Sequence, residues 1–299
     1  MSRLDGQPAA FPACSPLPPR CPCGLAGEAS EAVPIDPQNL FAIRDKTSII
    51  TGAAGGIGTV LVAGFAALGV RVLAVDIVDP KDPPAGVAFH RADLRDPVAV
   101  AGIAEEAAAR LGTVDILINN AGLGEMVRAE EMALEVWNNT LATNLTGSFL
   151  LSQAVGRGMI ARRSGKIVNI GSRCGFMGMP FSAAYNASKA GIAALTRTLA
   201  VEWGLYDIQV NAIIPGVVRT QMNAHRDDDP EEERLFARTI PLGRVSEPDD
   251  MLGAAVFLAS PAANYITGAT LFVDGGNYMA DGIGTEYRDH GLKRMGVIG

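Results

Sequence analysis

The sequence predicts an α/β fold in which one doubly wound parallel sheet of about seven strands carries helices on both faces. Short apolar, β-rich runs alternate with longer helical stretches along most of the chain, and strands joined by crossover helices build parallel sheets. The 299 residues are 48% hydrophobic and 19% charged. This composition supplies a sizeable core and excludes a mostly disordered chain.

The first predicted element is a buried strand over 47–51, followed by a glycine turn and a helix over 56–69. The stretch 47–70 contains no charged residue and is long enough to suggest a membrane helix. Six of its residues are glycines, and four of these crowd between 52 and 58. Strands of parallel sheets are buried on both faces and therefore read as unbroken apolar runs. We interpret the stretch as strand, turn and helix, and we expect no membrane partner.

The same alternation continues to residue 273. Further strands are predicted over 70–75, 87–91, 115–118, 166–170, 209–213 and 269–273. Further helices are predicted over 97–112, 134–161, 182–204 and 247–259. The longest stretch without a clear strand, about 219–246, is rich in polar residues and is predicted to form a lid. Its acidic run over 227–233 is interpreted as a solvated face.

Residues 1–39 form a Pro/Cys-rich extension that we predict to be flexible. The first 37 residues hold 8 of the 18 prolines and 3 of the 4 cysteines, and such a composition buries too little apolar surface to offset its ordering entropy. Cys14, Cys21 and Cys23 lack the paired spacing of zinc sites, which favours a flexible tail over a metal or redox site. No secretory signal is recognisable, so a cytoplasmic location is expected.

The charge balance argues against nucleic acid as a partner. The chain carries 25 basic and 32 acidic residues, a formal net charge of −7, and the basic residues form no run. Proteins that bind nucleic acid concentrate Lys and Arg on one face. We therefore expect a small-molecule enzyme domain over 40–276, with a C-terminal extension over 277–299.

The turn after the first strand predicts a phosphate site. Glycines at 52, 56 and 58 permit a tight turn and the close approach of backbone N–H groups to a pyrophosphate at a helix N-terminus. The second strand ends at Asp76, where a carboxylate accepts hydrogen bonds from both ribose hydroxyls of NAD and repels the 2′-phosphate of NADP. No Arg or Lys in the turn or at 77–78 offsets that repulsion. The sequence predicts NAD, with NADP less favoured; the alternative is that Asp76 caps a loop.

Tyr185 and Lys189 are the candidate catalytic pair. They lie four residues apart in a predicted helix and so share one face. An ammonium group nearby lowers a phenol pKa from its reference of about 10. The tyrosine can then take the hydroxyl proton of an alcohol while hydride leaves for nicotinamide. The alternative for an isolated pair is an ordinary helix surface, and the surrounding motifs decide between the two.

Those motifs resemble the short-chain dehydrogenase/reductase family in order and spacing over residues 40–276. They are TGAAGGIG at 51–58, Asp93-Leu94, NNAG at 119–122, NLTGSF at 144–149, NIGS at 169–172, YNASK at 185–189, PGVVRT at 215–220 and VDGG at 273–276. The resemblance implies a single-domain Rossmann-type fold, an oxidoreductase that moves hydride between NAD and a secondary alcohol or ketone, and a homo-oligomer, either a dimer or a homotetramer.

The resemblance also implies roles for individual residues. Tyr185 is the acid/base, and Ser172 hydrogen-bonds the substrate oxygen. Lys189 binds the nicotinamide ribose and tunes Tyr185, while Asn144 holds a water for proton relay; the alternative for Asn144 is an amide that bends the helix. Val218 and Thr220 contact the carboxamide. The full cofactor set that it implies is Gly52, Gly56, Ile57, Gly58, Asp76, Asp93, Leu94, Asn120, Ala121, Gly122, Tyr185, Lys189, Pro215, Gly216, Val218 and Thr220.

The substrate candidates lie between Ser172 and Tyr185 and in the lid. Cys174, Phe176 and Met179 are candidates for an apolar pocket, together with Met222; core or subunit-interface packing is the equal alternative. Arg173 beside the serine is placed to grip a carboxylate or to pair within the protein.

Three alternatives to a general secondary-alcohol dehydrogenase stay open. The pattern is also similar to sugar-acid dehydrogenases of the gluconate type. A 3-ketoacyl reductase docks an acidic carrier protein, which an acidic lid opposes. A non-catalytic NAD-binding protein has no reason to keep the set Asn144, Ser172, Tyr185 and Lys189 intact.

Overall fold

The computed structural model describes residues 36, 37, 39–220, 230–280 and 293. The chain divides into two compact units, residues 1–37 and 38–299, and every element below belongs to the second. The three N-terminal cysteines, Met222, residues 227–229 of the acidic run and most of the tail beyond 280 lie outside the described residues.

Seven strands form one sheet, and every neighbouring pair is parallel. The order is β3-β2-β1-β4-β5-β6-β7. The strands are β1 (Thr47–Thr51), β2 (Arg71–Asp76), β3 (Ala88–Arg91), β4 (Ile116–Asn119), β5 (Gly165–Ile170), β6 (Ile208–Pro215) and β7 (Thr270–Val273). The predicted doubly wound parallel sheet is confirmed.

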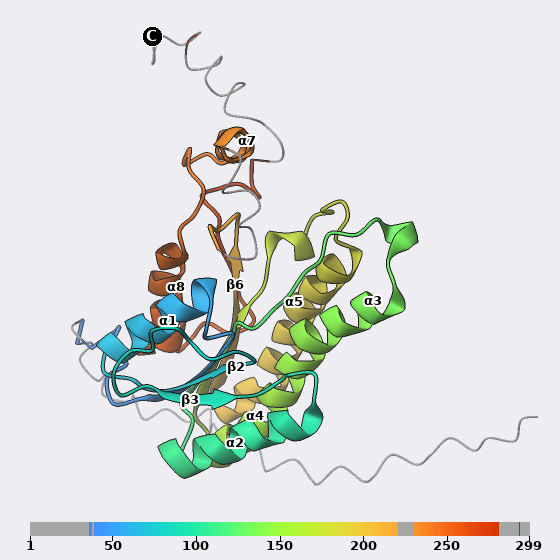
Figure 1. Cartoon of the computed structure of the whole chain (residues 1–299). Helices are drawn as coiled ribbons and strands as arrows, with labels where there is room; N and C mark the ends of the chain where they lie inside the picture. The colour runs from blue at the N-terminus through green and yellow to red at the C-terminus, as the bar shows by residue number, and fades with distance from the viewer. Residues whose placement is uncertain (1–35, 38, 221–229, 281–292, 294–299) are drawn as a thin grey trace, which may run out of the picture. The chain divides into compact units, whose positions relative to one another are not determined.

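Helices cover both faces because the strands are apolar on both sides. In β1, Ile50 packs into one apolar cluster and Ile49 into the other, and both are fully buried. The first cluster includes α1 (Gly56–Ala67) and α8 (Leu252–Ala259). The second includes α2 (Pro97–Leu111), α4 (Ser148–Arg162) and α5 (Ala183–Trp203). Figure 1 shows α1 and α8 on one side of the sheet and α4 and α5 on the other.

The helix predicted over 134–161 is interrupted. α3 (Leu134–Leu141) is followed by a π-helical segment, Ala142–Gly147, before α4 begins at Ser148. Asn144 lies inside this segment, and its side chain is bonded to both backbone groups of Leu123, which lies outside the helix. A π turn widens the helix locally and commonly marks a functional site.

The carboxyl ends of the strands place the sequence motifs at one edge. From β1 the chain winds outward through β2 and β3, and from β4 it winds the other way. Such a reversal opens a crevice outside the carboxyl ends of the strands, where ligands bind. The glycine turn follows β1, and Asp76 ends β2.

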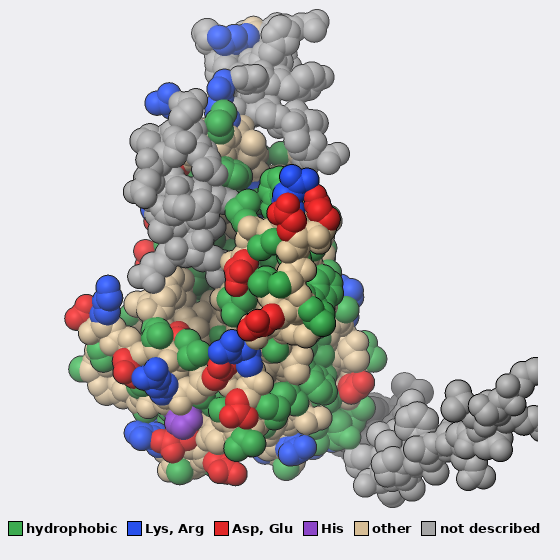
Figure 2. All heavy atoms as spheres, turned by 45° about the vertical axis from the view of Figure 1, so that its right-hand side comes forward, with side chains coloured by type: hydrophobic (Ala, Val, Ile, Leu, Met, Phe, Trp, Pro, Cys, Tyr) green, Lys and Arg blue, Asp and Glu red, His purple; other side chains and the backbone are tan. Residues whose placement is uncertain are grey.

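The predicted lid contains a helix. α7 (Pro230–Thr239) lies in the segment 219–246, whose described residues add no strand to the sheet. In the part of the chain that the structure describes, no helix is long and apolar enough to span a membrane. On the face shown in Figure 2, basic side chains are scattered among acidic ones.

Candidate active site

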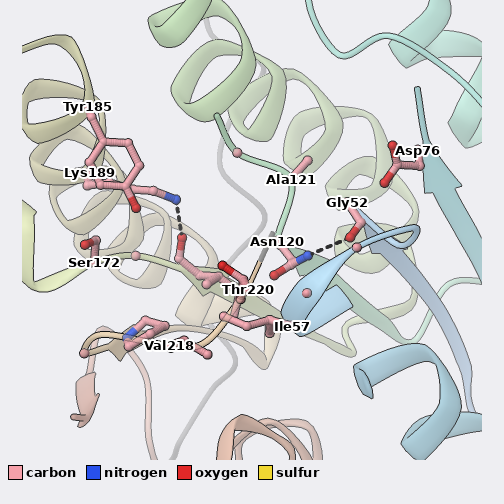
Figure 3. A pocket seen from close by; sticks show the side chains of 17 residues that line it. Gly52, Ile57, Asp76, Asn120, Ala121, Ser172, Tyr185, Lys189, Val218 and Thr220 are labelled. Atoms are coloured by element: carbon pink, nitrogen blue, oxygen red, sulfur yellow. Dashed lines mark hydrogen bonds between the residues drawn. The ribbon is translucent and has the colours of Figure 1, made fainter. Parts of the chain in front are cut away.

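A cavity of about 320 Å³ lies at the carboxyl ends of the strands. Figure 3 shows Asp76 on one side of it and Ser172, Tyr185 and Lys189 on the other, with Asn120 between them. Its lining contains Gly52, Gly55, Gly56, Ile57, Asp76, Asn120, Ala121, Gly122, Ile170, Gly171, Ser172, Tyr185, Lys189, Pro215, Gly216, Val218 and Thr220. The fold therefore brings most of the sequence-predicted cofactor residues to one cavity, and it adds Gly55, Ile170 and Gly171.

The glycine turn is held in a shape that side chains would obstruct. Gly52 and Gly56 have φ angles of +65° and +48°, which favour glycine. A Cβ at Gly58 would lie 1.8 Å from the carbonyl oxygen of Gly52. Asn120 Nδ2 fixes the turn by donating to the carbonyl oxygens of Thr51 at 2.9 Å and Gly52 at 3.0 Å. Gly58 does not line the cavity; it lets α1 begin directly against the turn.

The Asp76 carboxylate is oriented by backbone donors. Its Oδ2 accepts from the Ala54 N–H at 2.9 Å and its Oδ1 from the Val78 N–H at 3.2 Å. The first bond ties the end of β2 to the glycine turn. Asp76 borders the main cavity and also a second one.

The second cavity, of about 250 Å³, contains Asp93 and Leu94, as the resemblance implies for an adenine site. Arg95 also lines it, and its guanidinium pairs with Asp93, with Nη2 and Oδ2 2.6 Å apart. This hydrogen bond holds the pKa of Asp93 below its usual value. Arg95 is absent from the sequence-predicted residues, because the charge argument against NADP covers only the glycine turn and residues 77–78. The sequence signal for Arg95 is its position two residues after Asp93.

The reactive end is built by α5 and the end of β5. Tyr185 and Lys189 lie on one face of α5, and Ser172 follows β5. Lys189 is buried, and its Nζ donates to the carbonyl oxygen of Ile170 at 2.8 Å, which is the bond drawn beside it in Figure 3. Nζ lies 5.7 Å from the centre of the Tyr185 ring. The three sequence-predicted residues are thus brought together.

Burial dominates the titration of this pair. It raises the pKa of Tyr185 to about 12, although the Ser172 hydroxyl opposes the rise. It lowers the pKa of Lys189 to about 8. The prediction that Lys189 draws the phenol pKa below 10 is wrong for this pocket, because taking the phenol out of water outweighs the favourable contacts.

Asn144 lies outside the lining of both cavities. Its Oδ1 accepts from the Leu123 N–H and its Nδ2 donates to the Leu123 carbonyl, both at 2.8 Å. The same Nδ2 donates to Ser188 Oγ at 3.0 Å, and Ser188 donates to the Tyr185 carbonyl at 2.8 Å. Asn144 thus connects the loop after β4 to α5. Ser188 is absent from the sequence-predicted residues, and its place inside YNASK was the available signal.

The substrate candidates that the structure describes are not among the lining residues of these two cavities. Arg173 is buried and donates to Asn277, which favours the alternative of pairing within the protein. Phe176 packs edge-on against two rings, those of Phe272 and Tyr278. Met179 and Cys174 are partly buried in the same loop, and the Cys174 N–H donates to Ser172 Oγ at 3.2 Å.

Comparison with known proteins decides the family. A family model described as enoyl-(acyl carrier protein) reductase matches residues 52–277. The D-threitol dehydrogenase of Mycolicibacterium smegmatis is 40% identical over 246 residues, which cover 79% of this chain and 94% of that enzyme. The chain belongs to the short-chain dehydrogenase/reductase family.

Two further matches agree. The NAD-dependent glycerol dehydrogenase of Listeria innocua is 38% identical over 79% of this chain and 95% of its own length. The crystal structure of a gluconate 5-dehydrogenase from Burkholderia cenocepacia in complex with NADP and tartrate is 35% identical with a TM-score of 0.76, covering 81% of this chain and 98% of that one. As a short-chain dehydrogenase/reductase, the chain is an oxidoreductase that acts on the CH–OH group of a secondary alcohol, and the predicted family is confirmed.

Proposed function

We propose that this short-chain dehydrogenase/reductase oxidises a secondary hydroxyl group of a polyol or sugar acid with NAD and reduces the corresponding ketone. The observation that carries the proposal is one cavity with Asp76 at one end and Ser172, Tyr185 and Lys189 at the other. The substrate class is supported by the similar proteins, which are named for threitol, glycerol and gluconate.

The residues present fit a dinucleotide. The Gly52–Gly58 turn leaves backbone N–H groups at the start of α1 uncovered by side chains, which suits a pyrophosphate. Asp76 suits the adenosine ribose, and the second cavity suits adenine. Lys189 suits the nicotinamide ribose, and Val218 and Thr220 the carboxamide. When bound, the nicotinamide ring supplies the hydride acceptor.

The protein's own part in oxidation is proton removal and charge stabilisation. Tyr185 takes the proton of the alcohol hydroxyl in its phenolate form. Ser172 Oγ donates a hydrogen bond to the substrate oxygen. Lys189, held in place by the Ile170 carbonyl, stabilises the phenolate with its charge. Asn144 fixes the loop after β4 against α5, and it keeps the proposed role of holding a water for proton relay.

Oxidation is expected to rise with pH between 7 and 8, by up to about tenfold, since each pH unit below a pKa changes the basic form about tenfold. The phenolate is required, and burial raises the Tyr185 pKa to about 12, so its fraction keeps growing over this range. Above pH 8 the slope flattens because Lys189, with a pKa of about 8, loses the charge that favours phenolate. Initial rates of alcohol oxidation at saturating NAD, measured at half-unit steps on both sides of this range, test the expectation.

Ketone reduction uses the protonated phenol, so its rate is expected to stay level from pH 7 to 8, where burial keeps the Tyr185 pKa well above the working pH. Circular dichroism at each pH controls for unfolding. An oxidation rate that is flat or falls over the same range would contradict the assignment of Tyr185 as the base.

Asp76→Asn is expected to raise the ratio of kcat/KM for NADP to that for NAD by about tenfold, the effect of roughly 1.4 kcal/mol of charge repulsion. The amide keeps an oxygen acceptor but removes the charge that faces a 2′-phosphate. Asp79→Asn is the matched control, because Asp79 lies in the loop that follows Asp76 and has an exposed side chain. If Asp76→Asn and Asp79→Asn both keep the wild-type ratio of kcat/KM for NADP to that for NAD, charge repulsion by Asp76 does not set the cofactor preference.

The substrate class is tested with purified protein and a panel of D-threitol, galactitol, glycerol and D-gluconate, each with NAD and NADP, by NADH or NADPH absorbance. Acetoacetyl-coenzyme A with NADPH tests the 3-ketoacyl reductase alternative. Binding of NADH without turnover of any panel member would favour the non-catalytic alternative.

We also propose that the catalytic domain spans 40–276, that it works in the cytoplasm, and that it forms a homo-oligomer. Exposed apolar side chains on the outer helices support association, with Phe149 on α4 and Val201 on α5 among them. Light scattering on the purified chain distinguishes monomer, dimer and tetramer.

A further inference from the structure

One side chain joins the loop beside Ser172 to the end of the lid helix. Arg173 Nη1 donates to Asn277 Oδ1. Asn277 Nδ2 donates to the backbone carbonyl oxygen of Thr239 at 2.9 Å and to Thr239 Oγ1 at 3.0 Å. Thr239 is the last residue of α7. A single amide therefore contacts both the neighbour of Ser172 and the lid helix.

The hydrogen bonds are consistent in direction. Thr239 Oγ1 donates its own proton to the Phe236 carbonyl at 2.8 Å, so it accepts from Asn277. A carbonyl at the end of a helix lacks an intrahelical partner, and the amide supplies one. Arg173 and Asn277 are 9% and 8% exposed. A buried polar group without a hydrogen-bond partner costs its full desolvation free energy. Breaking these contacts is therefore unfavourable.

The turn that carries Asn277 is itself held rigidly. The buried Asp274 carboxylate accepts from the Gly276 N–H at 2.9 Å and from the Tyr278 N–H at 2.7 Å. The Tyr278 ring stacks on Phe272 of β7, with centroids 4.6 Å apart. The centroid of the same ring lies 6.0 Å from that of Phe176, in the loop after Ser172. Asn277 is thus a fixed point between two segments.

The other end of the lid is tied close to the cofactor residues. Arg219, between Val218 and Thr220, pairs with Glu247 at 3.0 Å and with Glu233 of α7. These ion pairs are partly exposed and so contribute little by themselves. The attachment of α7 through Asn277, in contrast, is buried.

We propose that Asn277 is a positioning residue that couples the seating of the lid helix α7 to the position of Ser172. The proposal rests on the proposed function, in which Ser172 hydrogen-bonds the substrate oxygen. When α7 is seated, the Asn277 amide is anchored at Thr239 and its oxygen holds Arg173, which fixes the adjacent serine.

Two variants distinguish the contact of Asn277 with Arg173 from its contact with Thr239. Asn277→Asp keeps an oxygen acceptor for Arg173 and loses the donor to Thr239. Asn277→Leu loses both. Tyr278→Phe, in the same turn, keeps the stacked ring and serves as the control. Hydrogen–deuterium exchange of the full chain, with NADH present, is followed for peptides within 173–182 and 233–239.

The aspartate variant is expected to raise exchange about tenfold in 233–239 and by a smaller factor in 173–182, because the side chain that holds Arg173 loses its anchor at Thr239. The leucine variant is expected to raise it in both peptides, and the control in neither. No increase in 173–182 for Asn277→Asp, or none there for Asn277→Leu, would overturn the coupling. Exchange needs no turnover, so this result is independent of whether the proposed activity is found.

Kinetics add a second readout with D-threitol and NAD. Asn277→Asp is expected to raise the KM for D-threitol about fivefold with kcat within about twofold of wild type. Asn277→Leu is expected to lower kcat by about tenfold or more, since misplacing a catalytic group by about 1 Å can cost about 100-fold. A kcat for Asn277→Leu within about twofold of wild type would refute the role of Asn277 in positioning Ser172.

Discussion

Tyr185→Phe is expected to lower kcat for alcohol oxidation by about 100- to 10,000-fold, the usual contribution of a positioned acid/base. The variant removes only the hydroxyl. The ring is retained, and it packs so closely on Gly124 that a Cβ there would lie 2.8 Å from it. The expected loss is therefore chemical and not structural. Steady-state rates, NADH affinity by fluorescence and the melting temperature are to be measured together.

The control for this prediction is Tyr206→Phe. Tyr206 lies under the Arg163 guanidinium, in the turn after α5, and its hydroxyl has no place in the proposed reaction. Its loss is expected to leave kcat within about twofold of wild type. Activity of Tyr185→Phe within about fivefold of wild type, against the far larger loss expected of an acid/base, would show that another group moves the proton.

Gly58→Ala is expected to lower kcat/KM for the cofactor by about 100-fold, because a small displacement of binding groups has large kinetic effects, and to destabilise the fold by about 1–3 kcal/mol through overpacking. The added Cβ would lie 1.8 Å from the Gly52 carbonyl oxygen and 2.8 Å from Asn120 Nδ2. Both atoms belong to the turn that shapes the pyrophosphate site, so α1 and the turn must separate.

Gly102→Ala is the matched control. Gly102 lies inside α2, and a Cβ there meets no atom within 4 Å. Alanine is favoured over glycine in a helix by about 0.5–1 kcal/mol, so this variant should melt slightly higher with unchanged kinetics. Unchanged NADH affinity in Gly58→Ala, measured by fluorescence titration, would show that the turn tolerates the added Cβ and would contradict this prediction.

The active-site motifs could be read from the sequence because each is short and local. The glycine turn, Asp76 and the pair Tyr185 and Lys189 sit at the ends of predictable elements, and a parallel sheet brings its carboxyl ends to one edge. Arg95 was not predicted as a site residue, because its role depends on which loop borders the second cavity. Ser188 was not predicted either, because its hydrogen-bond partner, Asn144, is 44 residues away in the sequence.

The sequence by itself determined the sheet, its two helical layers and most of the residues that line the cavity. Periodicity and glycine placement act over a few residues, and crossover connections leave few topologies open. Only the tertiary structure decided three matters that depend on distant partners. The Leu123 backbone bonds to Asn144 within a π turn, and Arg173 donates to Asn277, 104 residues further along the chain. Packing around Tyr185 sets its pKa, because desolvation is a property of the whole fold and not of a motif.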